Sequence, residues 1–60
     1  MSYTLTKDNI RVQIRITKDT AEMFKIVGGN TSTTKTVLTP TEAVRKVNEL
    51  IQEGYTAHKH

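Results

Sequence analysis

Arg11, Gln13 and Arg15 occupy every second position of one alternating segment, and their side chains are suited to binding an anion. The segment 10–17 alternates apolar and polar residues without exception, and an extended backbone projects successive side chains to opposite faces. Such a strand has one face on a core and the other in water. Arginine binds phosphate with paired hydrogen bonds, and arginine and glutamine can reach base edges. The pattern therefore predicts an anion-binding surface on the wet face of a sheet.

Two lysines are expected to extend this surface from neighbouring strands. In the second strand an inward Phe24 turns Lys25 outward, and in the third an inward Leu38 turns Lys35 outward. Four cations on one flat surface suit contacts to phosphate, and a sheet can contact a nucleic-acid groove. The residues expected to contact nucleic acid are Arg11, Gln13, Arg15, Lys25 and Lys35.

Apolar side chains on the same face suggest a different partner. With Ile26 directed to the core beside Phe24, Met23 and Val27 turn outward, and Val37 does so in the following strand. Mixed apolar and basic patches are typical of protein-binding surfaces. The alternative hypothesis is a small accessory or inhibitor protein of the phage or mobile-element type. It would bind a protein partner, or a second copy as a homodimer, through Met23, Val27 and Val37 or through the edge strand.

Both binding hypotheses compete with simpler interpretations. The charged residues could only solubilise the wet face, and the apolar ones could be buried by a different register. Aromatic residues that could stack on bases are also scarce, because only Tyr3 and Tyr55 remain for that role.

Metal binding and catalysis find no support in the sequence. His58 and His60 would point the same way in an extended chain, but two ligands without cysteine or a matched carboxylate make a poor metal site. No serine or threonine has a neighbouring histidine and acid that spacing would bring together, and the carboxylates are scattered. We therefore expect a non-enzymatic protein without a cofactor.

The elements that would position these residues form an α+β fold. Strands are expected over 10–17, 21–27 and 31–38, with a turn at Gly28-Gly29-Asn30 before the third strand. The three strands form an antiparallel meander, and one C-terminal helix packs on one face of it. The segment 1–9 is interpreted as a lead-in and 55–60 as a tail, and either terminus could add a short strand.

The helix is expected over 40–53. Thr39 is a suitable N-cap, Pro40 fits the first helical position, and Glu42 completes a capping box. Gly54 is expected to end the helix in the left-handed conformation. The apolar residues at helical spacing are Ala43, Val44, Val47, Leu50 and Ile51.

Size and composition limit the class of protein. The chain has 60 residues, which predicts one small domain, 1–60. It has no cysteine and therefore no disulfide, and its formal charge is +3. Its longest apolar runs are two residues, so we expect no membrane span. No basic stretch followed by an apolar one begins the chain, which favours a cytoplasmic location.

The order of the expected elements is similar to that of small sheet-type DNA-binding domains of plant transcription factors and of some phage integrases. The likeness is one of topology, a three-stranded meander followed by a helix. It implies DNA binding by the sheet and transfers no residue to this chain, because the aromatic-rich motifs of the plant group are missing.

Overall fold

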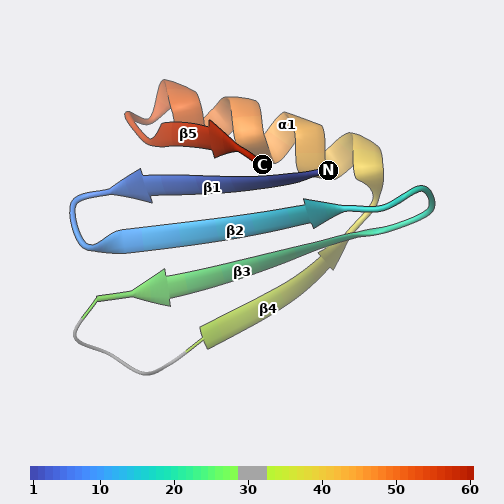
Figure 1. Ribbon diagram of the computed structural model, residues 1–60, viewed down its shortest axis with the longest axis horizontal. Helices are drawn as coiled ribbons and strands as arrows, with labels where there is room; N and C mark the ends of the chain where they lie inside the picture. The colour runs from blue at the N-terminus through green and yellow to red at the C-terminus, as the bar shows by residue number, and fades with distance from the viewer. Residues whose placement is uncertain (29–32) are drawn as a thin grey trace.

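The computed structural model describes residues 1–28 and 33–60, which form an α+β fold of one antiparallel sheet and one helix (Figure 1). The five strands lie in the order β4-β3-β2-β1-β5. The elements are β1 (Ser2–Lys7), β2 (Ile10–Ile16), β3 (Ala21–Val27), β4 (Thr33–Leu38), α1 (Pro40–Gln52) and β5 (Thr56–Lys59).

The expected meander followed by a helix is confirmed in outline, and the extra strand that either terminus could add is present at both. Four strands precede the helix and one follows it, because both termini join the sheet. β1 pairs with β2 through the short connection Asp8–Asn9, where Asp8 has a φ of 53°. β5 pairs with β1, and the two chain ends lie together. The predicted turn residues 29 and 30, and the predicted strand residues 31 and 32, lie outside the described residues.

The start and the end of α1 follow local signals. The Thr39 hydroxyl accepts a hydrogen bond from the Glu42 N–H (3.2 Å), and the Glu42 carboxylate accepts one from the Thr39 N–H (3.1 Å). This capping box satisfies two donors that a helix start leaves without intrahelical partners. Gly54 has a φ of +103°, as predicted for the residue that ends the helix.

The core lies between α1 and one face of the sheet. Its sheet side comes from β1, β2 and β3, and its helix side from one stripe of α1. Val44 and Ile51, expected in that stripe, are 49% and 46% exposed. Successive residues are about 100° apart around a helix, so five apolar residues span a stripe wider than the contact with the sheet. Val44 and Ile51 lie at the sides of this stripe and stay exposed. The buried residues are Leu5, Val12, Ile14, Ala21, Ala43, Val47 and Leu50.

The predicted orientation of β3 is wrong. Residues directly opposite in an antiparallel pair project to the same face, and Met23 lies opposite the buried Ile14. Phe24 and Ile26, expected in the core, therefore lie on the face away from the helix. The turn over 17–20 sets this orientation of β3, because it pairs Ile16 with Ala21. A change of register by one residue would reverse every side chain of the strand.

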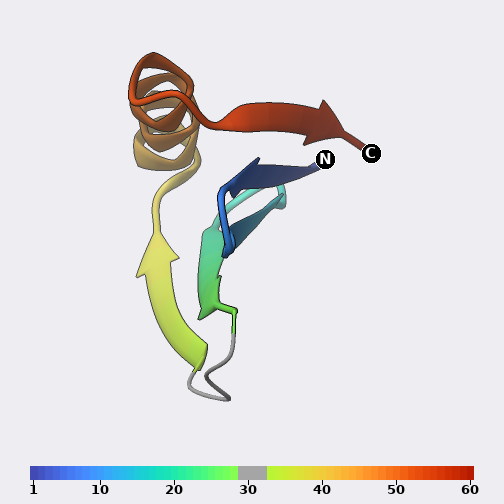
Figure 2. The same ribbon diagram turned by 90° about the vertical axis from the view of Figure 1, so that its left-hand side faces the viewer.

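The helix covers only one face of the twisted sheet. In the edge-on view α1 lies beside one side, and no described element covers the other (Figure 2). We call this uncovered side the outer face. The end of β3 and the start of β4 lie far from the helix in the same view. Among the described residues, no helix has the length and apolar character needed to cross a membrane.

Candidate functional site

Three rows of side chains cross the outer face, as the strand registers show. The middle row contains His58, Thr4, Gln13, Phe24 and Lys35. The row on one side of it contains Thr56, Thr6, Arg11, Ile26 and Thr33. The row on its other side contains His60, Ser2, Arg15, Glu22 and Val37. Charged, aromatic and hydroxyl groups therefore share one surface.

Phe24 lies in the middle row, on the strand next to the β4 edge. It is directly opposite Gln13 on β2 and Lys35 on β4, and its side chain is only partly buried. The Lys35 ammonium nitrogen is 6.0 Å from the centroid of the ring, at the outer limit of a cation–π contact. The sequence predicted no phenylalanine on the outer face, and this prediction is wrong. The register of β3 places the ring of Phe24 there.

Three cations share the outer face with the ring. Arg11 and Arg15 lie on β2, one on each side of the row that holds Phe24. Four residues of extended chain place their Cα atoms roughly 13 Å apart. Within the described chain, no carboxylate lies within ion-pair distance of either arginine. Both guanidinium groups are therefore available to an anion.

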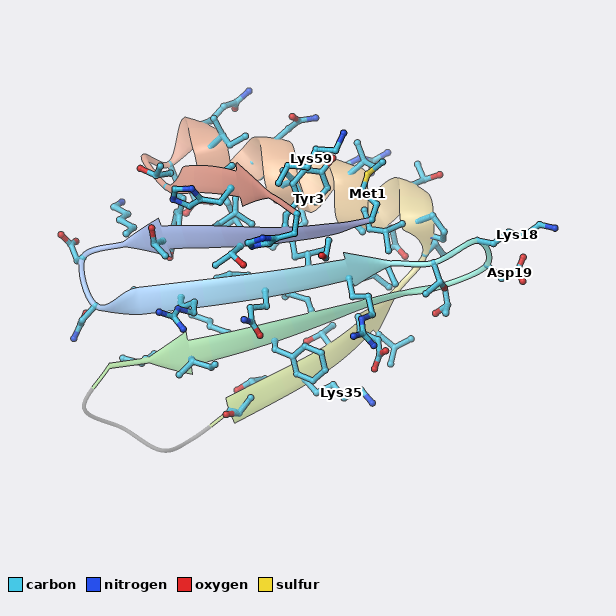
Figure 3. The ribbon with its side chains drawn as sticks, in the orientation of Figure 1. Met1, Tyr3, Lys18, Asp19, Lys35 and Lys59 are labelled. Carbon is cyan, nitrogen blue, oxygen red and sulfur yellow. The ribbon has the colours of Figure 1, made fainter. Side chains whose placement is uncertain are left out.

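The third cation, Lys35, has a partner. Its ammonium nitrogen lies 2.9 Å from a carboxylate oxygen of Glu22, and 55% of the lysine side chain remains exposed. Exposed ion pairs of this kind contribute about 0–1 kcal/mol, so a phosphate could displace Glu22 at small cost. Lys35 is at the β4 edge of the sheet (Figure 3).

The five residues predicted to contact nucleic acid are not all together. Arg11, Gln13, Arg15 and Lys35 share the outer face, as expected. Lys25 lies opposite Val12, on the side that carries the helix, so its predicted orientation is wrong. The cause is the register of β3 described above.

The alternative protein-binding set is also divided between the faces. Met23 lies on the helix side and packs against the core, and Val27 lies on the same side opposite Ile10. Val37 lies opposite Glu22 on the outer face and is 67% exposed. Because the three residues do not form one surface, they do not define a single interface.

Shallow hollows lie along the outer face, and two of them are formed by residues in the described ranges. The larger has a volume of about 380 Å³ and extends from β1 to β3. Its residues on the outer face are Ser2, Thr4, Gln13, Arg15, Phe24 and His60. The second, of about 260 Å³, lies beside Arg11 and Ile26 near the turn between β1 and β2. The face thus offers an aromatic ring, hydrogen-bonding groups and positive charge next to concave surface.

The histidines belong to this surface through β5. A ring nitrogen of His60 lies 2.8 Å from the Thr4 hydroxyl oxygen, and His58 is directly opposite Thr4. The sequence offered no signal for this, since the pairing joins the two ends of the chain. In the part of the chain that the structure describes, no three residues among His, Cys, Asp and Glu are grouped as a metal site.

No protein-family model matches the chain, and no curated protein or solved structure matches it. The expected likeness in element order to the sheet-type DNA-binding domains also changes, because β1 and β5 add a strand at each end of the chain.

Proposed function

We propose that this protein binds nucleic acid through its outer sheet face, with Arg11, Arg15 and Lys35 at phosphates and Gln13 and Phe24 at bases. The observation that carries the proposal is the uncovered aromatic ring of Phe24 with three cations on the same face. Phosphate contacts supply affinity, and aromatic rings on a sheet stack on bases. The proposed role is binding alone, without a chemical reaction.

The distribution of carboxylates supports this choice of face. Among the residues of the outer face that the strand registers place, three cations accompany one carboxylate, Glu22. The exposed side of α1 carries Glu42, Arg45, Lys46 and Glu49, with Glu49 3.5 Å from Lys46 and Glu53 at the C-cap. Carboxylates outnumber cations there, so a polyanion gains less attraction at the helix than at the outer face. The outer face therefore has the better electrostatic complementarity to phosphate.

Binding of labelled oligonucleotides over a range of KCl concentrations tests the proposal. Fluorescence anisotropy should show affinity that falls as salt rises, because each phosphate contact releases counterions. A double variant, Arg11→Gln with Arg15→Gln, should reduce the slope of log K against log salt by roughly 1.4–1.8, or about 0.7–0.9 for each lost contact.

The matched control removes two charges from the opposite side of the sheet. Lys25 lies opposite Val12 and Lys59 opposite Tyr3, so both are on the helix-bearing side, and both are exposed. Lys59 is labelled in Figure 3. The double variant Lys25→Gln with Lys59→Gln loses the same net charge and should keep the wild-type slope. Absence of binding by the wild-type protein at low salt, or an equal loss in the control, contradicts the proposal.

A further inference from the structure

The larger hollow on the outer face has the chemical groups that an unstacked base requires. Phe24 supplies a flat apolar surface, and the Gln13 amide directly across from it can both donate and accept hydrogen bonds. Arg15 adds a donor, and the hydrogen-bonded pair of Thr4 and His60 closes the side toward β5. Its volume of about 380 Å³ lies in the range of small-ligand sites, roughly 300–1,000 Å³.

From this hollow we infer that the ligand is single-stranded nucleic acid, with a base stacked on Phe24. The inference rests on the proposed function and adds the substrate class. A single strand can turn its bases out toward an aromatic ring, whereas paired bases in a duplex are stacked on each other. The site therefore selects unpaired bases.

The positions of the arginines fit this arrangement. Arg11 and Arg15 lie on both sides of the Phe24 row along the strand direction, roughly 13 Å apart at Cα. A strand that places one base on the ring can direct the flanking phosphates to the two guanidinium groups. Arginine is well suited to this because its planar group binds phosphate with paired hydrogen bonds.

The width of the sheet works against duplex binding. Phe24 is on β3, with β4 on one side and three strands on the other. Four strand spacings of about 4.8 Å make a sheet roughly 19 Å wide. The major groove of B-DNA is about 12 Å wide and admits a helix or a two-stranded ribbon. The ring therefore cannot reach the bases in the major groove of B-DNA without the flanking strands meeting the phosphate backbone.

Titrations with three probes of equal length test the inference. These are single-stranded DNA, single-stranded RNA and double-stranded DNA of roughly 12 nucleotides per strand at low salt. The wild-type protein should bind at least one single strand more tightly than the duplex. Phe24→Ala should weaken single-strand binding roughly 5- to 150-fold, the usual range for loss of one stacked base, and change duplex binding little. Val37→Ala, on the same face but outside the hollow, is the control and should change neither.

Phe24→Trp supplies a direct readout that does not depend on comparing affinities. The natural chain contains no tryptophan, so the introduced indole is the only one in the protein. Stacking on a base should quench its fluorescence, and the variant should retain single-strand affinity. Circular dichroism checks that each variant is folded.

The outcomes separate the two proposals. Equal affinity for duplex and single strand, or an indole whose fluorescence is unchanged by a bound single strand, overturns the stacking inference. Nucleic-acid binding by the outer face, through the phosphate contacts of Arg11, Arg15 and Lys35, would then still stand. No binding of any of the three probes overturns both.

Discussion

The two faces of the sheet contain apolar side chains of similar size but bury them to very different extents. Val12 and Ile14 under the helix are 2% and 1% exposed, whereas Phe24 and Ile26 on the outer face are only partly buried. The difference comes from α1, which lies on one side only (Figure 2). Burial in this protein is therefore decided by the position of the helix and not by the hydrophobicity of a strand residue.

This comparison explains how the outer face can hold both apolar and charged groups. An aromatic ring in the place of Val12 or Ile14, directly under the helix, would be enclosed by the core and inaccessible to a ligand. On the outer face the same ring stays accessible beside Arg11, Arg15 and Lys35. The covered face stabilises the fold, and we propose that the uncovered face binds. Substitutions on the two faces should accordingly affect different measurements.

The largest expected effect is on stability. Ile14→Ala should lower the free energy of unfolding by about 2–5 kcal/mol, because it leaves a cavity between the sheet and the helix. A domain of this length has a total of roughly 3–9 kcal/mol, so the variant loses much of its stability. Urea denaturation followed by circular dichroism measures the change.

Its control is the neighbouring residue on the other face. Gln13 is exposed, so Gln13→Ala should change the free energy of unfolding by no more than about 0.5 kcal/mol. If the two substitutions destabilised the protein equally, the contrast between a covered and an uncovered face would be wrong.

The second largest expected effect is on nucleic-acid binding, and substitutions of two lysines on opposite faces test it. Lys35→Glu should weaken nucleic-acid binding about tenfold, because it removes a phosphate contact and places a second carboxylate beside Glu22. Lys25→Glu makes the same change in net charge on the helix side and should weaken binding no more than about threefold. Anisotropy titrations at one salt concentration compare them. Equal losses would mean that net charge alone governs binding and that the face does not matter.

The smallest effect concerns the start of the helix that covers one face. The hydrogen bond from the Thr39 backbone lowers the pKa of the Glu42 carboxyl below its ordinary value of 4.5, and the Thr39 side chain and Arg45 act in the same direction. A lowered pKa in the folded state means that this contribution to stability is present above pH 4.5 and is lost as the pH falls through the folded-state pKa. Glu42→Gln should therefore reduce the melting temperature slightly at pH 7 and converge on the wild-type value in acid.

Thermal melts of Glu49→Gln at the same pH values provide the control. Glu49 is exposed on the same helix and takes no part in the capping box. A pH dependence that Glu42→Gln leaves unchanged would show that the capping carboxylate does not hold the helix start.

Part of the candidate site could be predicted from single segments. The alternation in β2 correctly places Arg11, Gln13 and Arg15 on one face, because side-chain direction alternates within any strand. Whether Phe24 or Lys25 joins them depends on how β3 pairs with β2, and its irregular apolar pattern does not specify that register. The prediction that the larger apolar residues of β3, Phe24 and Ile26, face the core assigned them to the wrong face.

The sequence alone determined the helix, its capping residues and the alternating strand β2, because these depend on residues at most a few positions apart. Only the tertiary structure decided that both termini join the sheet and which side of β3 faces the helix. Those features depend on pairing between distant segments, Leu5 with Ala57 for example, and on the register of the turn at 17–20. The contacts that form them are absent from any single segment, so local patterns carry no information about them.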